Sequence, residues 1–395
     1  MGIRLNSMSW IIASVVVAGL ALAVDRVLEP VAGGALLITM AVFLGLAEGA
    51  TVLMAGAEIS DGHWHRQLLP RVAALHAILP AVMLLWVVNI PQLSIYPWIE
   101  NDGFWFNRTF FIARHLVALA LVFLVARRFV TLALRGASTA RFWAVILVML
   151  FVAHLSLIGI EWFMSIERPW FSTLFGAFVM VSAFLSGICA CALVIFNWRK
   201  RTDPAAKLIQ KSIGGLIFGF ATFWAYFYFS QLIVIWYGNV PEETDYLARR
   251  IGYHTPYWLA ARLIFGMIWV VPFAVLLSRK NKTRALVTAP LALCVLSGVT
   301  LMYWLMLAPV VPVGVAALLI EIALMTLLTA AVVRSHASLV PARSGEEVLD
   351  NETRRVTRSG IRHAHAYPYR PPPDWPMIAN RPIPSVSTKL WSSSA

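Results

Sequence analysis

The chain has 395 residues, of which 60% are apolar and only 13% are charged. Soluble domains carry about 25% charged residues, so this composition excludes an ordinary soluble enzyme, a disordered chain and a disulfide-stabilised secreted domain. The net charge of +13 would favour nucleic-acid binding in a soluble protein, but here the positions of the Lys and Arg residues must decide its meaning.

Ten apolar stretches follow one another along the chain. A helix needs about 20 such residues to span a bilayer, so the sequence predicts an all-α polytopic membrane protein with about ten transmembrane helices. The first stretch, preceded by Arg4, also fits a cleavable signal peptide. In chain order the predicted spans are 9–28, 33–57, 70–90, 107–129, 141–164, 171–197, 212–237, 256–278, 286–308 and 312–334.

The order of the spans suggests two bundles of four helices with flanking helices. In chain order the expected parts are a first flanking helix (1–32), a first four-helix bundle with spans two to five (33–169), a second four-helix bundle with spans six to nine (170–308), a tenth helix (309–335) and a Pro-rich basic tail (336–395). The tail is too poor in aliphatic residues to fold alone. Polyproline segments are stiff, so we expect it to lie extended on a cytoplasmic surface, anchored by Trp375 and Trp391.

The basic residues predict the orientation of the chain, because Lys and Arg gather in cytoplasmic loops. With alternating spans, 25 of the 32 Lys and Arg residues fall on one side of the membrane and 5 on the other, while two lie within spans. Both termini are therefore expected in the cytoplasm. The excess positive charge is then a topology signal, and no nucleic-acid partner is predicted.

Cofactor motifs are missing from the sequence. The three cysteines all lie inside predicted spans, and there is no CxxCH motif for covalent haem, no CxxC pair and no iron–sulfur ligand pattern. Neither a P-loop nor an HExxH motif occurs. We expect this chain to bind no metal and no covalent haem, so that any such cofactor belongs to a partner subunit.

Ionisable side chains inside spans mark candidate functional positions, because each one costs free energy unless it is paired or hydrated. Five of them fall in spans two to five, at depths that step from the cytoplasmic side towards the outer face. They are the candidates for a proton route: Glu48, His76, His115, His154 and Glu161. His154 and Glu161 are seven residues apart, which places both on one helix face. Arg114 is expected to extend towards the outer headgroups.

Other roles remain open for these residues. A buried His often only links two helices through a hydrogen bond, and His115 with His154 could hold one b-type haem. The second group of four spans is nearly free of ionisable residues, so we expect any polar chemistry in the first group.

Two segments on the expected outer side are distinctive. One follows span five and reads WFMSIERPWFSTLFG, and the other runs from span seven into a loop as FWAYFYFSQLIVIWYGNVPEET. Charged, Trp-rich loops often form binding surfaces, so both are expected to meet partner subunits. The residues predicted to make these contacts are Glu167, Trp170, Glu242 and Glu243.

Together these two segments resemble the second large membrane subunit (ActF type) of bacterial alternative complex III, a quinol:electron-acceptor oxidoreductase. The resemblance covers the ten spans in number and orientation, while the basic tail has no counterpart in it. It implies a relation to NrfD-like membrane subunits of polysulfide-reductase-type complexes. It also implies that quinol is oxidised near the outer face, and that electrons pass to iron–sulfur clusters and c-type haems in partner subunits.

From this resemblance we expect a multi-pass subunit of the bacterial inner membrane in a respiratory or photosynthetic electron-transfer chain. Its partners would be a homologous membrane subunit, an iron–sulfur subunit, c-type cytochrome subunits and a terminal haem–copper oxidase. The homologous subunit is usually credited with the quinol site, so this chain would be structural and, as a further expectation, proton-conducting; Glu161 or His154 could accept a proton from quinol. The alternative is a stand-alone proton-coupled secondary transporter.

Overall fold

The computed structural model describes residues 7–29, 33–62, 64–100, 103–196 and 204–337. These residues form helices and no strand, and ten helical segments are long and apolar enough to cross a membrane. The prediction of an all-α multi-pass membrane protein is confirmed. The observed spans are Trp10–Leu28, Gly34–Ile59, His65–Ile95, Arg108–Leu134, Ala140–Ile166, Phe175–Phe196, Lys207–Gly238, Trp258–Leu276, Ala285–Leu307 and Val315–Ser335. The predicted tail anchors Trp375 and Trp391 lie outside the described residues.

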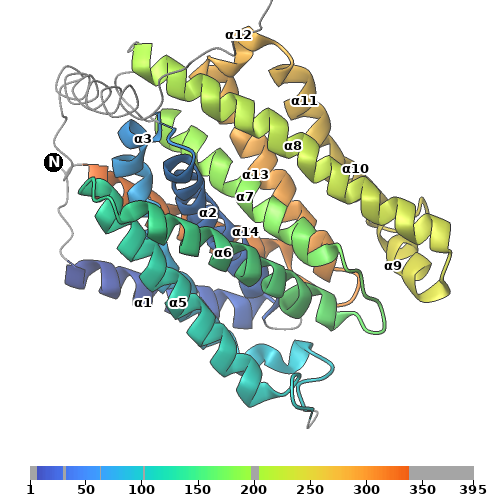
Figure 1. Ribbon diagram of the computed structural model, residues 1–395. Helices are drawn as coiled ribbons and strands as arrows, with labels where there is room; N and C mark the ends of the chain where they lie inside the picture. Colours follow the sequence, from blue (N-terminus) through green and yellow to red (C-terminus); the bar gives the residue numbers. More distant parts are fainter. Residues whose placement is uncertain (1–6, 30–32, 63, 101–102, 197–203, 338–395) are drawn as a thin grey trace, which may run out of the picture. The chain divides into compact units, whose positions relative to one another are not determined.

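Figure 1 shows α2 and α7 in the middle of the bundle, with α1 and α5 towards one side of them and α8 to α12 towards the other. The helices are α1 (Ser7–Leu28), α2 (Gly34–Ile59), α3 (His65–Val72), α4 (Leu79–Asn89), α5 (Arg108–Leu134), α6 (Ala140–Ile158), α7 (Phe175–Phe196), α8 (Pro204–Gly238), α9 (Pro241–Ile251), α10 (Trp258–Phe265), α11 (Val271–Leu276), α12 (Arg279–Lys282), α13 (Ala285–Leu307) and α14 (Val315–Ala337). Short 3₁₀ or π segments join some of them: η1 (Ala73–Ile78), η2 (Ile90–Ile95), η3 (Gly159–Phe163), η4 (Met164–Ile166) and η5 (Gly266–Val270).

Helix α2 forms the centre of the core. It is apolar on all sides, and a helix of that kind must be buried all round; every residue from Gly34 to Ala55 is buried. Its most extensive contact among the described helices is with α7, where Gly49 and Gly187 bring the two backbones together. Small residues allow this close approach between membrane helices. Because α2 and α7 come from different predicted bundles, the two groups share one core.

Three of the spans depart from regular α-helix. The third span passes through η1 and contains Pro70 and Pro80, each of which lacks the N–H that a helical hydrogen bond requires. The fifth and eighth spans contain the π segments η3 and η5. A π segment adds a residue to one turn and often occurs at functional sites. In the fifth span it carries Glu161.

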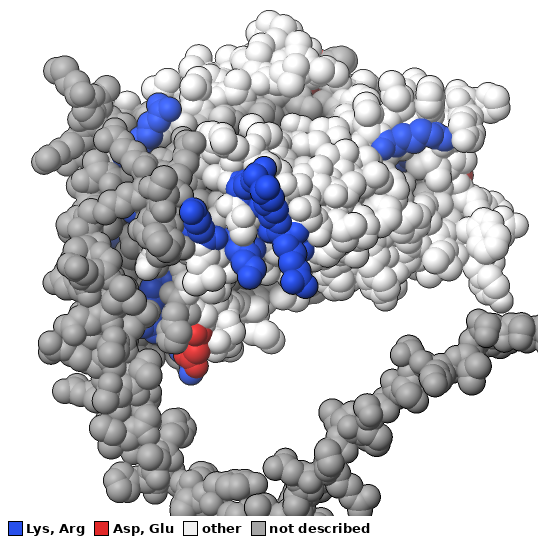
Figure 2. Space-filling view, turned by 90° about the horizontal axis from the view of Figure 1, so that it is seen from above, with Lys and Arg blue, Asp and Glu red and all other residues white. Residues whose placement is uncertain are grey.

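The alternating helices place the loops at two ends of the bundle. One end, here called the basic end, holds the last residues of α2, α5, α7 and α11; Arg141 pairs with Asp61 there, and Gly214 contacts Lys282. Figure 2 shows several Lys and Arg side chains close together near the middle of the view and others apart from them, while most of the other described surface in view is uncharged. The other end of the bundle is here called the opposite end. That the basic end faces the cytoplasm remains a prediction from the positive-inside rule.

Candidate functional site among the membrane spans

Glu161 is the centre of the first polar cluster. The carboxylate is fully buried, and its Oε2 accepts a hydrogen bond of 2.8 Å from Nε of Arg114. The same oxygen lies 2.8 Å from Nε2 of His115, and Oε1 accepts a 2.7 Å bond from the indole nitrogen of Trp105. Arg114 and His115 are neighbours on α5, whereas Glu161 comes from η3. We call these four residues the Glu161 cluster.

Aromatic rings enclose the Glu161 cluster. Trp86 and Trp162 stack with their ring centroids 5.0 Å apart and nearly parallel. The His115 ring meets Trp86 edge-on at 5.3 Å. The Arg114 guanidinium lies 4.7 Å from the centroid of the Trp105 ring. These rings fix the orientation of the charged groups and keep the local dielectric constant low, which strengthens the interactions inside the cluster.

Glu48 and His154 form a second pair, between α2 and α6. Nδ1 of His154 lies 2.9 Å from Oε1 of Glu48, and both side chains are buried. In the described part of the chain, Nε2 of His154 and Oε2 of Glu48 have no hydrogen-bond partner. Each member of the pair therefore keeps one polar atom with which it can exchange a proton.

The structure corrects the expected order of the candidates. His154 and Glu161 do not form a pair with each other. His154 contacts Glu48 of α2, whereas Glu161 contacts His115 of α5. Four of the expected five steps form two levels of the fifth span, with His154 on α6 and Glu161 on η3. Arg114 extends towards the loop before α5, where its Nη1 donates a 2.6 Å bond to the carbonyl of Trp105, and its Nε pairs with Glu161.

His76 lies closer to the basic end than these two levels. It belongs to η1, its Nδ1 contacts the carbonyl of Ala73, and its ring stacks on Phe123 with centroids 6.3 Å apart. The haem alternative for His115 and His154 stays a prediction, because one nitrogen of each ring faces a carboxylate and the other has no hydrogen-bond partner in the described part of the chain.

Two carboxylates near the end of α1 hold the starts of other spans. Oδ2 of Asp25 accepts a 2.8 Å bond from the backbone N–H of Gly33, just before α2, and Oε2 of Glu29 accepts a 2.9 Å bond from Gly314, just before α14. A helix N-terminus has free N–H groups and attracts negative charge. Burial raises the pKa of Glu29 to about 7. These contacts point to a structural role that the sequence alone did not suggest.

Glu321 has a partner that the sequence did not predict. It is fully buried on α14, and Thr39 of α2 donates a 3.1 Å hydrogen bond to its Oε2. In the described part of the chain, no three His, Cys, Asp or Glu residues are placed to bind a metal ion.

The two distinctive segments meet at the opposite end. Arg250 of α9 donates from Nη1 to Oε1 of Glu167 at 3.2 Å, its Nη2 contacts the other carboxylate oxygen, and Nη2 also donates to the carbonyl of Met306 at 2.8 Å. The ring of Tyr246 lies between the Arg250 guanidinium and the ring of Trp170. The guanidinium is 3.7 Å from the centroid of the Tyr246 ring, and the Trp170 ring stacks on it. These contacts join the turn after the fifth span to α9 and to the ninth span.

This arrangement changes the expected partner surface. Glu167 and Trp170 are both engaged within the chain, and Trp170 is only 4% exposed. Glu242 is exposed and Glu243 is half-buried in the first turn of α9, where their charges are favoured by the helix N-terminus. They remain the candidates for contact with another subunit.

We expect Arg250→Gln to destabilise the protein by about 3 kcal/mol, because it leaves the Glu167 carboxylate poorly paired in a largely buried position. The melting temperature of the detergent-solubilised chain measures the effect. Arg249→Gln is the matched control, since Arg249 is exposed, pairs with Asp245 and reaches Glu167 only at 4.0 Å, so its ion pairs are worth less than about 1 kcal/mol. Equal melting temperatures for the two variants would contradict the assignment.

The fold and these clusters define an all-α, multi-pass membrane protein with ionisable residues buried between its spans. Comparison with protein-family models gave no match, and comparison with curated proteins gave none.

Proposed function

We propose that this chain is an integral membrane subunit of a quinol-oxidising electron-transfer complex of the alternative complex III type. In this proposal it is structural, conducts protons through α2, α5 and α6, and is not catalytic by itself. The assignment to the complex is supported by the resemblance of the two distinctive segments. The proton-conducting role is supported by one observation: the Glu48–His154 pair and the Glu161 cluster lie at two successive levels of the fifth span.

The chemistry of the two levels suits proton transfer. Histidine changes charge near neutral pH, so a ring between a carboxylate and a second donor or acceptor can move a proton. His154 would take up a proton at Nε2 and release the proton on Nδ1 to Glu48. Buried ionisable residues of this kind form proton relays in other membrane proteins. The Arg114 guanidinium would keep Glu161 ionised and able to accept a hydrogen bond from His115.

Partner subunits would supply the redox centres in this proposal. Iron–sulfur clusters and c-type haems would lie in neighbouring chains, with a homologous membrane subunit beside this one. The exposed apolar residues Trp236 and Tyr237, next to the exposed Glu242, favour a docking surface at the opposite end. The proposed location is the inner membrane of a bacterium, with quinone as the small-molecule partner.

Purification tests the assignment to a complex. The tagged full chain is extracted from its native membranes in mild detergent, and the sample is analysed by mass spectrometry and by absorption and paramagnetic resonance spectra. We expect c-type haem proteins and iron–sulfur proteins to co-purify with it. A chain that purifies alone and drives proton-coupled uptake of a solute in vesicles would overturn the proposal in favour of a transporter.

We expect His154→Gln to slow proton transfer through the purified complex at least tenfold, because positioned acid–base groups contribute about that factor or more. The Gln amide can still donate to Glu48 but cannot carry a proton, so assembly should be preserved. Proton release and quinol oxidation are measured together in vesicles that contain a pH-sensitive dye. His254→Gln, at an exposed loop position, is the control. Unchanged proton release per electron in His154→Gln would refute the proton route.

A further inference from the structure

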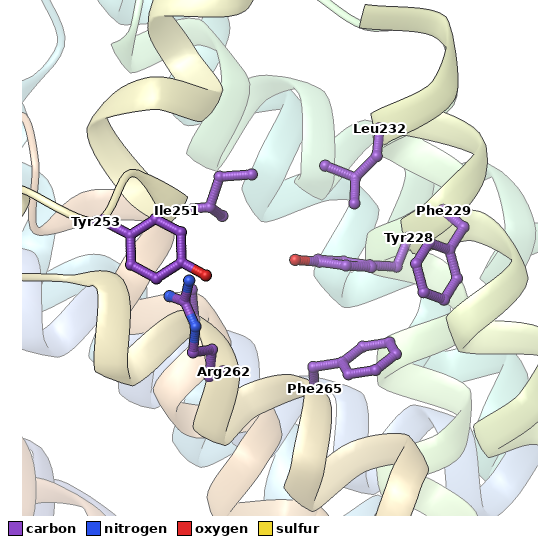
Figure 3. A pocket seen from close by; sticks show the side chains of 8 residues that line it. Tyr228, Phe229, Leu232, Ile251, Tyr253, Arg262 and Phe265 are labelled. Atoms are coloured by element: carbon purple, nitrogen blue, oxygen red, sulfur yellow. The ribbon is translucent and has the colours of Figure 1, made fainter. Parts of the chain in front are cut away.

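A pocket of about 420 Å³ opens between α8, α10 and the loop after α9, apart from the buried ionisable pairs. Its volume lies within the range of small-molecule sites. Figure 3 shows Tyr228 entering the pocket from one side, while Tyr253 and Arg262 face it from the other. The lining residues are Tyr228, Phe229, Leu232, Ile251, Tyr253, Ala261, Arg262 and Phe265.

Arg262 provides the positive charge of the pocket. Its Nη1 donates a 2.8 Å bond to the carbonyl of Trp258, one turn earlier on the same helix, and its guanidinium lies 4.4 Å from the ring centroid of Tyr253. Among the described residues no carboxylate is within ion-pair distance of Arg262, whereas Arg114 and Arg250 are each paired with a glutamate. The guanidinium therefore keeps donors available for an anion.

The rest of the pocket is apolar and opens on the surface of the bundle. Phe229, Leu232 and Phe265 form its wall. Next to this wall, Ile233 is 61% exposed on α8, so the apolar surface continues outside the pocket. Arg262 lies about one turn from the start of its span, at the depth where headgroups meet acyl chains.

We propose that this pocket binds one phospholipid with an anionic headgroup. The phosphate contacts Arg262 and the hydroxyls of Tyr228 and Tyr253, and an acyl chain lies along Phe229 and Phe265. Guanidinium groups bind phosphate through paired hydrogen bonds, and a cation without a protein counter-ion at this depth favours an anionic ligand over a neutral one. The apolar wall favours a lipid over free phosphate.

Lipid binding to the full chain tests the proposal. Purified protein is placed in nanodiscs of phosphatidylcholine with a small fraction of phosphatidylglycerol, and the lipids that remain bound are counted by native mass spectrometry. We expect retained phosphatidylglycerol to exceed its share of the mixture, and Arg262→Gln to lower this retention about fivefold, as the loss of one basic contact implies. Arg108→Gln, an exposed arginine at the same end, should change nothing.

A second variant separates the site from folding. In Leu232→Trp the larger side chain should occupy the space along the apolar wall and displace the acyl chain, while Arg262 stays in place. This variant should therefore also lower lipid retention. The proposal would be overturned if the wild type retained the two lipids in proportion to their shares of the mixture. It would also be overturned if Arg262→Gln retained as much phosphatidylglycerol as the wild type. Displacement of the lipid by millimolar inorganic phosphate, or by a quinone in preference to phosphatidylglycerol, would also overturn it.

Discussion

Gly187→Ala is expected to disrupt the membrane core at the contact between α2 and α7. A Cβ at this position would lie 2.1 Å from the backbone N of Ala50 and from the backbone carbonyl carbon of Gly49. These are main-chain atoms of α2, so no side-chain rotation can relieve the clash. The two helices would have to separate, at a cost of about 3 kcal/mol or more. Melting temperature and size-exclusion profile in detergent measure the loss.

Gly219→Ala is the matched control on α8. Its added Cβ would meet no heavy atom within 4 Å, and alanine favours a helix over glycine by about 0.5–1 kcal/mol. The two variants should therefore shift the melting temperature in opposite directions. If neither variant changes the melting temperature, α2 and α7 do not approach each other as closely as the structure shows.

Glu161→Ala is expected to destabilise the chain by about 3–5 kcal/mol, because it removes the only carboxylate that pairs with Arg114 in the described structure and leaves a buried charge unpaired. His115 and Trp105 lose the same acceptor. Glu161→Gln keeps one oxygen acceptor and should lie between the wild type and the alanine variant. Thermal unfolding followed by circular dichroism measures the stability of each variant.

A double variant distinguishes loss of pairing from loss of volume. Replacing Arg114 and Glu161 together by leucine removes both charges, and such exchanges are often neutral or stabilising, so part of the lost stability should return. Glu242→Gln, at an exposed carboxylate, should have no effect on melting. If the double variant is less stable than Glu161→Ala, the unpaired charge of Arg114 is not the main cause of the stability lost in Glu161→Ala.

The sequence by itself determined the number of membrane spans and their approximate limits. In a bilayer every backbone polar group must be satisfied within the segment, so a continuous apolar run of sufficient length has a single regular solution, the helix. The eighth span shows this: the sequence predicted 256–278, and the structure has Trp258–Leu276. The third span was predicted too short, because Pro70 and polar residues such as His65 lie within it.

Buried candidate positions were also visible in the sequence, because an ionisable residue inside an apolar run is conspicuous. Glu48, His115, His154 and Glu161 are all buried. The irregular backbone around Glu161 was not visible, since a π turn has no clear sequence signal.

Only the tertiary structure decided which of these residues meet. Helical periodicity relates residues on one helix, and it placed His154 and Glu161 on one helix face; the partner of His154 in the structure is Glu48, which is 106 residues away. That contact depends on α2 packing against α6, and Glu161 reaches His115 only because α5 packs against α6. The capping of α2 by Asp25 likewise requires the chain to turn back at Gly33. The local sequence determines whether each span inserts into the membrane. Which side chains contact one another depends on packing and on charge pairing between spans that are distant in the chain.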